Sequence, residues 1–357
     1  MTEQSRVLDT FDRLLGINSP SGQEQALAEY LVRELQNLGL TTEVDKAGNV
    51  IALGAGEGEP LLLCAHMDTV ESTEGLRVIR ENGIIRSDGT TILGADDKAG
   101  IAAILEALRL ARKRPPVEVV FTVREEIGLQ GANALDLSSL KAKRGIVLDA
   151  GGAICTLVTG APSQIKLTAK VIGKAAHAGV SPEKGINAIV VAAQAITHMP
   201  LGRIDDETTA NIGFIHGGRA TNIVPELVEL RGEARSHSEE KLAAQMQAMR
   251  TALQSAAAEA GARVEIEEER SYTRFAVPDS HSLVATVLAV AQREGFEGTC
   301  IKSGGGSDAN VFNRTGIQCF NLSVGMGSSH AKDEYIVADD LVKATHLLAA
   351  VLVALAG

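Results

Sequence analysis

The chain has 357 residues, a length that favours two domains over a single hydrophobic core. Hydrophobic residues make up 45% of it and charged residues 22%, as in soluble globular proteins. A formal net charge of -11 argues against nucleic acid as a partner, and 3% aromatic residues with no Trp argue against base stacking on a single strand.

The N-terminus has no basic region followed by an apolar run, so no signal peptide is predicted. The apolar stretches are too short to span a membrane. Four widely spaced cysteines form no CxxC pair, which is typical of free thiols in a reducing cytosol. We therefore expect a cytoplasmic protein that binds neither membrane nor nucleic acid.

The first part of the chain alternates helical and strand-like patterns. Apolar spacing of three or four predicts helices over 3–15 and 23–38, and residues 19–22 can cap the second. Short apolar runs between Gly-rich turns predict buried strands at 50–53 and 61–65.

The pattern continues with a hairpin over 76–93 and a helix that begins after Asp97. Apolar runs at 117–123 and 145–148 predict two more buried strands. Buried strands that alternate with helices indicate an α/β fold whose mixed, mostly parallel sheet is flanked by helices.

Polar side chains follow three of these strands. His66 and Asp68 come after the strand at 61–65, Glu125 and Glu126 after the next, and Asp149 after the third. Sites in such sheets form outside the carboxyl ends of the strands, so we expect these side chains to meet.

The pattern changes near residue 162, where alternation of apolar and polar residues predicts a half-exposed antiparallel strand. The order from there is β-α-β-β-α-β, which predicts an inserted ferredoxin-like α+β domain. Its elements are expected at 163–172, 185–198, 207–216, 225–234, 238–260 and 262–269. The predicted domains are 1–161 with 273–357 and, inserted between them, 162–272.

Five residues at or near the strand ends are candidate metal ligands. Imidazole and carboxylate are ligands that zinc accepts, with cobalt or manganese as substitutes. If one carboxylate bridges, five ligands suffice for two ions, and a shared hydroxide makes the cluster neutral. The candidates are His66, Asp96, Glu126, Asp149 and His330.

Two further acidic positions suggest roles beside the metals. Neighbouring residues at a strand end point in opposite directions, so one of Glu125 and Glu126 can bind metal while the other faces the substrate and moves a proton. Asp68 can hydrogen-bond the His66 imidazole and fix its tautomer.

Four segments occur in one order: Ala65-His-Met-Asp-Thr-Val70, Leu93-Gly-Ala-Asp-Asp-Lys-Ala-Gly100, Arg124-Glu-Glu-Ile-Gly128 and Val147-Leu-Asp-Ala150. Together they resemble the co-catalytic zinc exopeptidases that include peptidase T, carboxypeptidase G and aminoacylase. The residues of these motifs are most similar to those of peptidase T (tripeptidase). The resemblance extends over nearly the whole chain.

The resemblance implies a role for each candidate. Asp96 would bridge two Zn²⁺ ions and form a cis peptide bond with Asp97. His66 and Asp149 would hold one ion, and Glu126 and His330 the other. Glu125 would be the general base and Asp68 would orient His66.

The inserted domain also carries family-like segments. Gly173–Gly179 resembles a lid motif, whose His177 would stabilise the oxyanion from its own subunit or from a dimer partner. The other expected substrate contacts are Asn222, either Arg231 or Arg235, and Gly305 and Gly306 in the loop 303–308.

The implied function is a dizinc metallopeptidase that hydrolyses short peptides through a zinc-bridging hydroxide. Peptidase T relatives usually have an Arg before the Gly-Gly of the last loop, whereas this chain has Lys302-Ser303-Gly304. An N-acyl-amino-acid deacylase or a carboxypeptidase is therefore the alternative, followed by an inactive binding or scaffold homologue. A homodimer through the inserted domain is expected.

Overall fold

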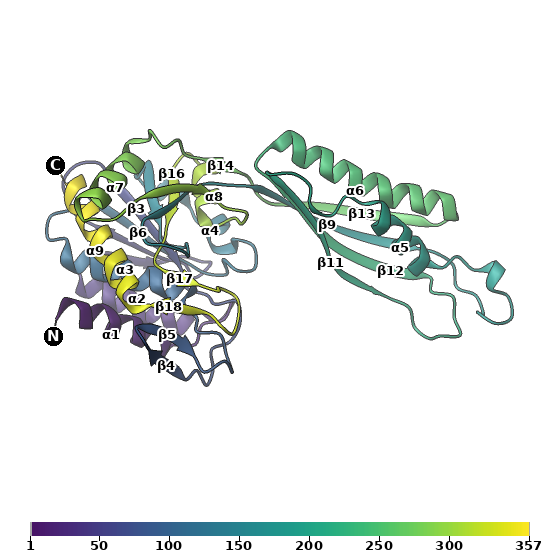
Figure 1. Ribbon diagram of the computed structural model, residues 1–357, viewed down its shortest axis with the longest axis horizontal. Coiled ribbons are helices and arrows are strands. Elements are labelled where there is room, and N and C mark those ends of the chain that lie inside the picture. The colour runs from purple at the N-terminus through teal and green to yellow at the C-terminus, as the bar shows by residue number, and fades with distance from the viewer. Residues whose placement is uncertain (1, 357) are drawn as a thin grey trace. The chain divides into compact units, whose positions relative to one another are not determined.

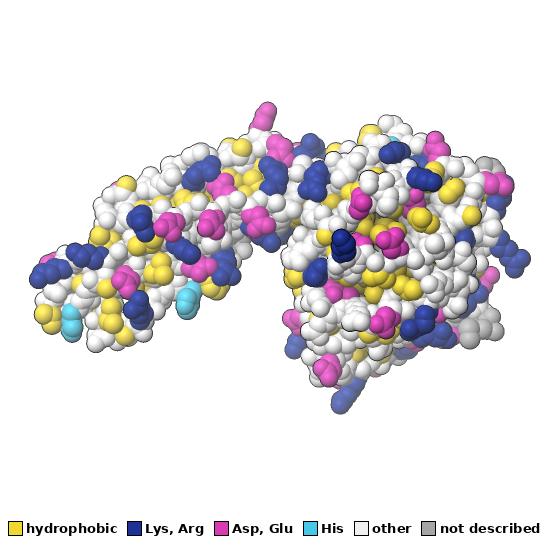
Figure 2. Space-filling view, turned by 180° about the vertical axis from the view of Figure 1, so that it is seen from behind, with side chains coloured by type: hydrophobic (Ala, Val, Ile, Leu, Met, Phe, Trp, Pro, Cys, Tyr) yellow, Lys and Arg dark blue, Asp and Glu magenta, His cyan; other side chains and the backbone are white. Residues whose placement is uncertain are grey.

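The structure is a computed structural model that describes residues 2–356, and its chain divides into two compact units. The first comprises 2–160, 275–303 and 307–356, and the second comprises 161–274 and 304–306 (Figure 1). On the face in Figure 2, acidic and basic side chains are interspersed over both units. Among the described residues, no helix is long and apolar enough to cross a membrane.

The first unit is built on a mixed sheet in the order β1-β2-β6-β3-β7-β16-β8-β14, with β15 beside β8. The neighbours β6, β3, β7 and β16 run parallel, whereas β2 and β8 pair antiparallel with this centre. The strands are β1 (Thr41–Val44), β2 (Val50–Gly54), β3 (Leu61–His66), β6 (Val117–Thr122), β7 (Arg144–Val147), β8 (Thr156–Ala161), β14 (Phe275–Ala276), β15 (Thr299–Lys302) and β16 (Gln318–Leu322). The expected mixed, mostly parallel sheet is confirmed.

The central strands have no exposed face. All residues of β3 and β6 are buried, which explains why apolar residues dominate both sequences instead of alternating with exposed polar ones. A fully buried Leu such as Leu62 or Leu63 contributes roughly 1.5–3 kcal/mol over an exposed one. This packing gives the carboxyl ends of β3 and β6 a rigid base.

Helices flank this sheet (Figure 1). Helix α3 packs on β3 and against α1 and α9, and α9 also contacts α7. The helices of this unit are α1 (Glu3–Leu15), α2 (Gln25–Asn37), α3 (Ala95–Leu110), α4 (Gln130–Ala134), α7 (Ser282–Arg293), α8 (Asp308–Arg314) and α9 (Ala338–Leu355).

A smaller sheet contains the predicted hairpin, β4 (Val78–Glu81) and β5 (Ile84–Ser87). Asn82 and Gly83 between these strands both have positive φ, at 52° and 79°, as a two-residue turn with this sequence requires. β18 (Tyr335–Val337) pairs with β5 and β17 (Met326–Gly327). This sheet brings the C-terminal segment around 330 beside the hairpin.

The second unit has the predicted β-α-β-β-α-β order and a five-stranded antiparallel sheet, β10-β11-β12-β9-β13. Without the short β10, this is the strand order of a ferredoxin-like sandwich. Helices α5 and α6 pack together and bury one face around Leu167, Leu230 and Met249. Its elements are β9 (Ser163–Ile172), α5 (Ala188–His198), β10 (Gly202–Arg203), β11 (Thr208–Gly217), β12 (Leu227–Ser236), α6 (Glu239–Ala260) and β13 (Arg263–Tyr272).

Two local predictions need correction. The residue before α2 is Glu24, which makes no side-chain cap, and Ser21 donates its hydroxyl to Asp68 Oδ2 (2.6 Å) instead of capping the helix. The edge strand β1 was missed, because Thr41–Val44 has only one apolar residue and lies at the exposed margin of the sheet.

Candidate metal centre

The candidate ligands come from neighbouring elements of the first unit. His66 is the last residue of β3, Glu126 follows β6, and Asp149 follows β7. Because β6, β3 and β7 are adjacent parallel strands, their carboxyl ends meet at one edge of the sheet. Asp96 joins them from the start of α3, and His330 from the loop between β17 and β18.

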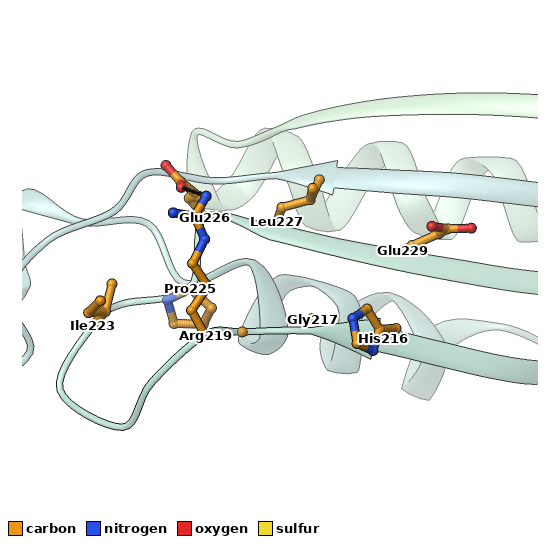
Figure 3. Close-up of a pocket in the computed structure, with 9 residues that line it drawn as sticks. His216, Gly217, Arg219, Ile223, Pro225, Glu226, Leu227 and Glu229 are labelled. Atoms are coloured by element: carbon orange, nitrogen blue, oxygen red, sulfur yellow. Dashed lines mark hydrogen bonds and ion pairs between the residues drawn. The ribbon is translucent and has the colours of Figure 1, made fainter.

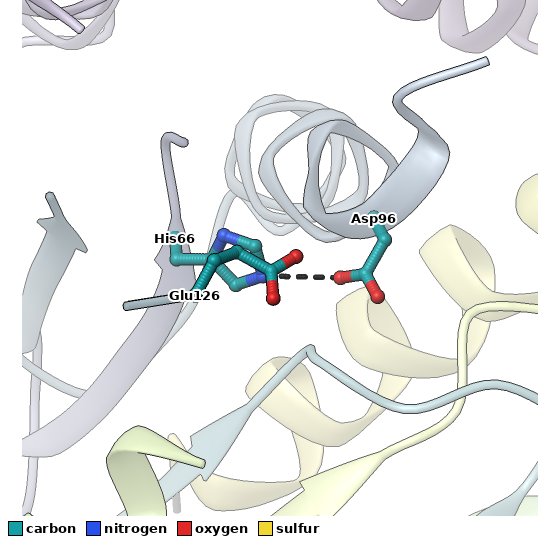
Figure 4. Close-up of side chains that lie close together, drawn as sticks. All are labelled: His66, Asp96 and Glu126. Carbon is teal, nitrogen blue, oxygen red and sulfur yellow. Dashed lines mark hydrogen bonds and ion pairs between the residues drawn. The ribbon is translucent and has the colours of Figure 1, made fainter. Parts of the chain in front are cut away.

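The Asp96 carboxylate has one oxygen beside each of two histidines. Its Oδ1 lies 3.0 Å from His66 Nε2 (Figure 4), and its Oδ2 lies 3.5 Å from His330 Nε2. His330 Nε2 is also 3.0 Å from Glu126 Oε1. A carboxylate placed in this way can serve two neighbouring ions, one through each oxygen.

A second group of potential ligands shares His66. Ligand atoms of His66, Asp97 and Asp149 lie within 4.8 Å of one another, as do those of His66, Asp96 and Glu126. The peptide bond between Asp96 and Asp97 is cis, as the resemblance implied. The Asp97 carboxylate accepts hydrogen bonds from two backbone N–H groups: Oδ2 accepts from His66 N (3.2 Å), and Oδ1 accepts from Gly100 N (3.1 Å).

These residues fit divalent metal ions. Ligand atoms about 2.0–2.1 Å from a tetrahedral zinc are separated from each other by roughly 3.3 Å, close to the 3.0–3.5 Å between the imidazole and carboxylate atoms here. Glu126 Oε1 is buried and receives no well-directed hydrogen bond within the described residues, even though His330 Nε2 is near. A metal ion would satisfy that oxygen.

Electrostatics also favour cations at this edge. Burial is the main reason why the pKa of Asp149 lies well above its ordinary value, and the nearby Asp96 raises it further. Burial likewise raises the pKa of Glu125 well above normal, with His66 opposing and Asp149 reinforcing the shift. Crowded, buried carboxylates of this kind need positive charge to remain ionised.

Asp68 makes more contacts than its predicted one. His66 Nδ1 is 2.9 Å from the Asp68 carbonyl oxygen and 3.5 Å from its Oδ1, which directs Nε2 toward Asp96. The Asp68 carboxylate also accepts from the backbone N–H groups of Glu125 (2.9 Å) and Glu126 (3.2 Å). Burial raises its pKa, but the hydrogen bonds from His66 and Ser21 outweigh this and leave the pKa below its ordinary value.

Glu125 and Glu126 do not lie on an extended strand, so the expected alternation of a strand end is wrong here. β6 ends at Thr122, and Arg124 has a left-handed φ of 52°. The chain therefore turns before the two glutamates, and the hydrogen bonds from their N–H groups to Asp68 hold the turn. Side-chain direction is set by that turn rather than by a period of two.

Two buried residues near this edge were not identified from the sequence. Glu334 accepts hydrogen bonds from Gly94 N (2.7 Å) and Asp96 N (2.9 Å). Asp308 accepts from the Thr122 hydroxyl (2.5 Å), and its Oδ1 is buried with no partner among the described residues. The one feature of the sequence that could have pointed to Glu334 is its position four residues after the candidate ligand His330.

The predicted residues His177 and Asn222 lie in neighbouring segments of the second unit. Ala178 N donates to Asn222 O (3.0 Å), and His177 pairs with Ile223 as an isolated bridge. The exposed His177 accepts at Nδ1 from Gly179 N (3.2 Å) and Val180 N (3.1 Å). The neutral ring therefore carries its proton on Nε2, where it can donate to a ligand.

The two candidate arginines have different surroundings. Arg231 lies over the Phe214 ring at 4.6 Å and donates to Glu229 (2.7 Å). Arg235 donates to Glu233 (2.8 Å) and, at 3.4 Å, to the carbonyl of Gly304 in the predicted substrate loop.

The glycine loop 304–306 is packed against Tyr272. Gly306 N donates to the Tyr272 hydroxyl (3.1 Å), and a Cβ on Gly306 would collide with the ring. A Cβ on Gly304 would meet nothing within 4 Å. Gly306, unlike Gly304, is thus required for the close approach of the backbone to an aromatic ring.

A pocket of about 230 Å³ lies at the end of the β11–β12 hairpin (Figure 3). Its walls include Gly217-Gly218 and residues 223–227, part of the segment that the sequence singled out. Arg219 and Glu226, which form an ion pair (2.7 Å), are among the residues that line it (Figure 3).

Known proteins resemble this chain over its whole length. The Bacillus subtilis "Uncharacterized protein YqjE" is 41% identical over 366 residues, which cover 99% of each chain. The structure of aminopeptidase PepT from Bacillus cereus has a TM-score of 0.91 and 39% identity, and covers 99% of both chains. A tripeptidase from Staphylococcus aureus has a TM-score of 0.95 and 38% identity, and covers 99% of this chain and 98% of its own.

A sequence model of one family matches residues 62–354, a span that includes all five candidate ligands and Glu125. The expected resemblance, the fold and a hydrolase of peptide bonds are thereby confirmed. The chain belongs to the peptidase family M20/M25/M40.

Proposed function

We propose that this peptidase is a metal-dependent exopeptidase for short peptides, with two Zn²⁺ ions as its native metals. His66, Asp96, Glu126, Asp149 and His330 would hold them. The observation that carries the proposal is the Asp96 carboxylate, which directs one oxygen toward His66 and the other toward His330. Cobalt or manganese would be accepted by the same imidazole and carboxylate donors.

Metals held by these residues would supply Lewis acidity, which would polarise a scissile carbonyl and lower the pKa of water. Glu125 then takes the proton from the attacking water and gives it to the leaving amine. Its buried position and raised pKa support this role, because a carboxylate that holds its proton more tightly is a stronger base toward water. Asp68 accepts hydrogen bonds from the Glu125 backbone and contacts the His66 ring. It would therefore fix the positions of the general base and of this metal ligand relative to each other.

His177 is proposed as the donor that stabilises the oxyanion of the tetrahedral intermediate. The hydrogen bonds from Gly179 and Val180 to its Nδ1 support this, because they leave the Nε2 proton available. Asn222, in the segment that pairs with the His177 loop, is proposed as a second polar contact for the substrate.

Of the two candidate arginines, we assign the substrate carboxylate to Arg235. Both arginines pair with a glutamate, but only Arg235 also contacts Gly304, which places its guanidinium beside the proposed substrate loop with Gly305 and Gly306. Arg235 can therefore take the role that an arginine before the Gly-Gly would have in peptidase T relatives.

The second unit, predicted as 162–272, is proposed to be the lid and dimerisation domain. Within the described residues, β10 pairs with β11 only at Thr209 and Ala210, so the remaining edge of β11 is open to another strand. Ile215 on this edge is 52% exposed, and Ile223 and Leu227 near it are also exposed. An open edge with apolar side chains favours a symmetric pair of lids.

The location proposed is the cytoplasm, where the four free cysteines would stay reduced. An N-acyl-amino-acid deacylase or a carboxypeptidase remains the alternative, since the same residues can act on either amide. An inactive homologue is disfavoured because all five candidate ligands and Glu125 are present in the chain.

The deciding experiment is an activity screen of the purified, zinc-loaded protein. Tripeptides, dipeptides, C-terminally blocked peptides and N-acetyl amino acids would be compared at equal concentration. Fastest release of the N-terminal residue from short peptides supports the proposal. Exclusive turnover of N-acetyl amino acids would favour the deacylase, and no turnover with two metals bound would contradict both.

A further inference from the structure

The backbone around Asp96 is held by a residue from a distant part of the chain. Glu334 lies in the loop between His330 and β18 and is 1% exposed. Its Oε2 accepts from Gly94 N at 2.7 Å, and its Oε1 accepts from Asp96 N at 2.9 Å. One carboxylate thus binds both donors of the turn that leads into α3.

The other side of this turn is fixed by close packing. Gly94 has a left-handed φ of 75°, and a Cβ there would lie 3.1 Å from Thr73 and 3.2 Å from Thr69. The turn is therefore confined between these threonines and the Glu334 carboxylate. A shift of Glu334 would move the backbone of Asp96 with it.

Burial raises the pKa of Glu334, and the hydrogen bonds from Asp96 N and Gly94 N oppose this shift. The buried Lys98 interacts electrostatically with it, and Lys98 Nζ donates to the carbonyl of Ile17 (2.7 Å). A buried carboxylate that has a cation nearby and two N–H donors is a stable anchor. Glu334 also follows the candidate ligand His330 by four residues, so it connects two of the ligand-bearing segments.

We propose that Glu334 is a positioning residue that fixes the Asp96 carboxylate between His66 and His330. This rests on the proposed metal centre. Glu334 contacts Asp96 only through the backbone, so its effect on chemistry is indirect. If Glu334 is lost, we expect the Asp96 carboxylate to be less well ordered and the more weakly held metal ion to bind with lower affinity.

A matched control separates positioning from plain stability. Glu118 at the start of β6 is 5% exposed, and its carboxylate likewise accepts two backbone N–H groups, from Lys141 (2.8 Å) and Ala142 (2.9 Å). It lies at the amino end of β6, whereas the ligands follow the carboxyl ends. Glu118→Gln should lower stability without touching the metal centre.

The test compares wild type, Glu334→Gln and Glu118→Gln as full chains. Each would be stripped with chelator and titrated with Zn²⁺ and with Co²⁺, by calorimetry and by visible absorption of the cobalt form. In Glu334→Gln an amide NH₂ replaces one acceptor oxygen and faces an N–H group. We expect affinity for the more weakly held ion to fall about 10–100-fold, with an altered cobalt spectrum. In Glu118→Gln the metal affinity and the cobalt spectrum should stay at the wild-type values while the melting temperature falls.

Unchanged metal affinity in folded Glu334→Gln, or an equal loss in Glu118→Gln, would overturn the inference. If Glu334→Gln does not fold, Glu334→Asp keeps the charge but retracts the carboxylate, and wild-type affinity in that variant would overturn it equally. A wild-type chain that binds no metal would instead refute the proposed metal centre. The two failures can therefore be told apart.

Discussion

His66 Nε2 and Asp96 Oδ1 lie 3.0 Å apart although 30 residues separate them in the chain. His66 ends a central strand, and Asp96 begins the helix that packs on that strand. The contact is thus a consequence of the sheet and helix packing. Beside this pair lies a third candidate ligand, Glu126, which follows the proposed base Glu125 in the chain.

The first prediction concerns Glu125. Glu125→Gln should lower kcat by about 10²–10⁴-fold or more, because the amide cannot accept the proton of the attacking water. Two ions per chain should still bind, since Glu125 is not among the proposed ligands. Metal analysis and steady-state kinetics check this, with Glu126→Gln as the comparison that should lose metal. An active Glu125→Gln enzyme with both metals would refute the assignment.

The second prediction concerns the glycine loop. Gly306→Ala puts a methyl group into the Tyr272 ring, so the loop must move and KM for a peptide should rise by about tenfold, the effect of roughly 1.4 kcal/mol of binding energy. Gly304→Ala is the control, because its methyl group meets nothing within 4 Å. Equal KM values for both variants would argue against a substrate role for Gly306.

The third prediction concerns the dimer. Ile215→Lys places a charge on the open edge of β11 and should yield a monomer in sedimentation. Val353→Lys in α9 is the control, since Val353 is 50% exposed but lies in the first unit. A wild-type monomer at micromolar concentration would contradict the proposal. The kcat of the Ile215→Lys monomer then shows whether His177 acts within its own subunit.

The fourth prediction concerns the pH dependence of stability in metal-free protein. Burial is the main cause that raises the pKa of Asp308 from 3.8 to about 6, against the hydrogen bond from Thr122. The folded chain binds this proton more tightly than the unfolded chain. The contribution of Asp308 to stability therefore falls as pH rises from about 4 to about 6. Above about pH 6 it stays constant.

Asp308→Asn has no such proton to lose. Relative to wild type, its free energy of unfolding should increase by up to about 3 kcal/mol between pH 4 and pH 7, for a pKa shift of about two. Urea unfolding at both pH values in the presence of a chelator measures this difference. The same wild-type-to-variant difference at both pH values would show that Asp308 does not titrate in this range.

Much of the fold followed from local rules. Mainly apolar runs marked the buried strands β3 and β6, alternation marked β9, and the Asn82-Gly83 pair marked the hairpin turn. Each signal depends on residues close together in sequence. The edge strand β1 escaped because it has only one apolar residue, and the capping of α2 was misjudged because Ser21 donates its hydroxyl to Asp68 instead.

By itself the sequence determined which residue types follow the central strands, and hence that His66, Glu126 and Asp149 meet at one edge of a parallel sheet. Only the tertiary structure decided how they are held. Asp68 binds the turn at Glu125, and Glu334 binds the turn at Asp96 from 238 residues away. Periodicity and motif order encode the direction of a side chain within its own element. Hydrogen bonds between distant loops depend on how the elements pack, and that packing exists only in the folded chain.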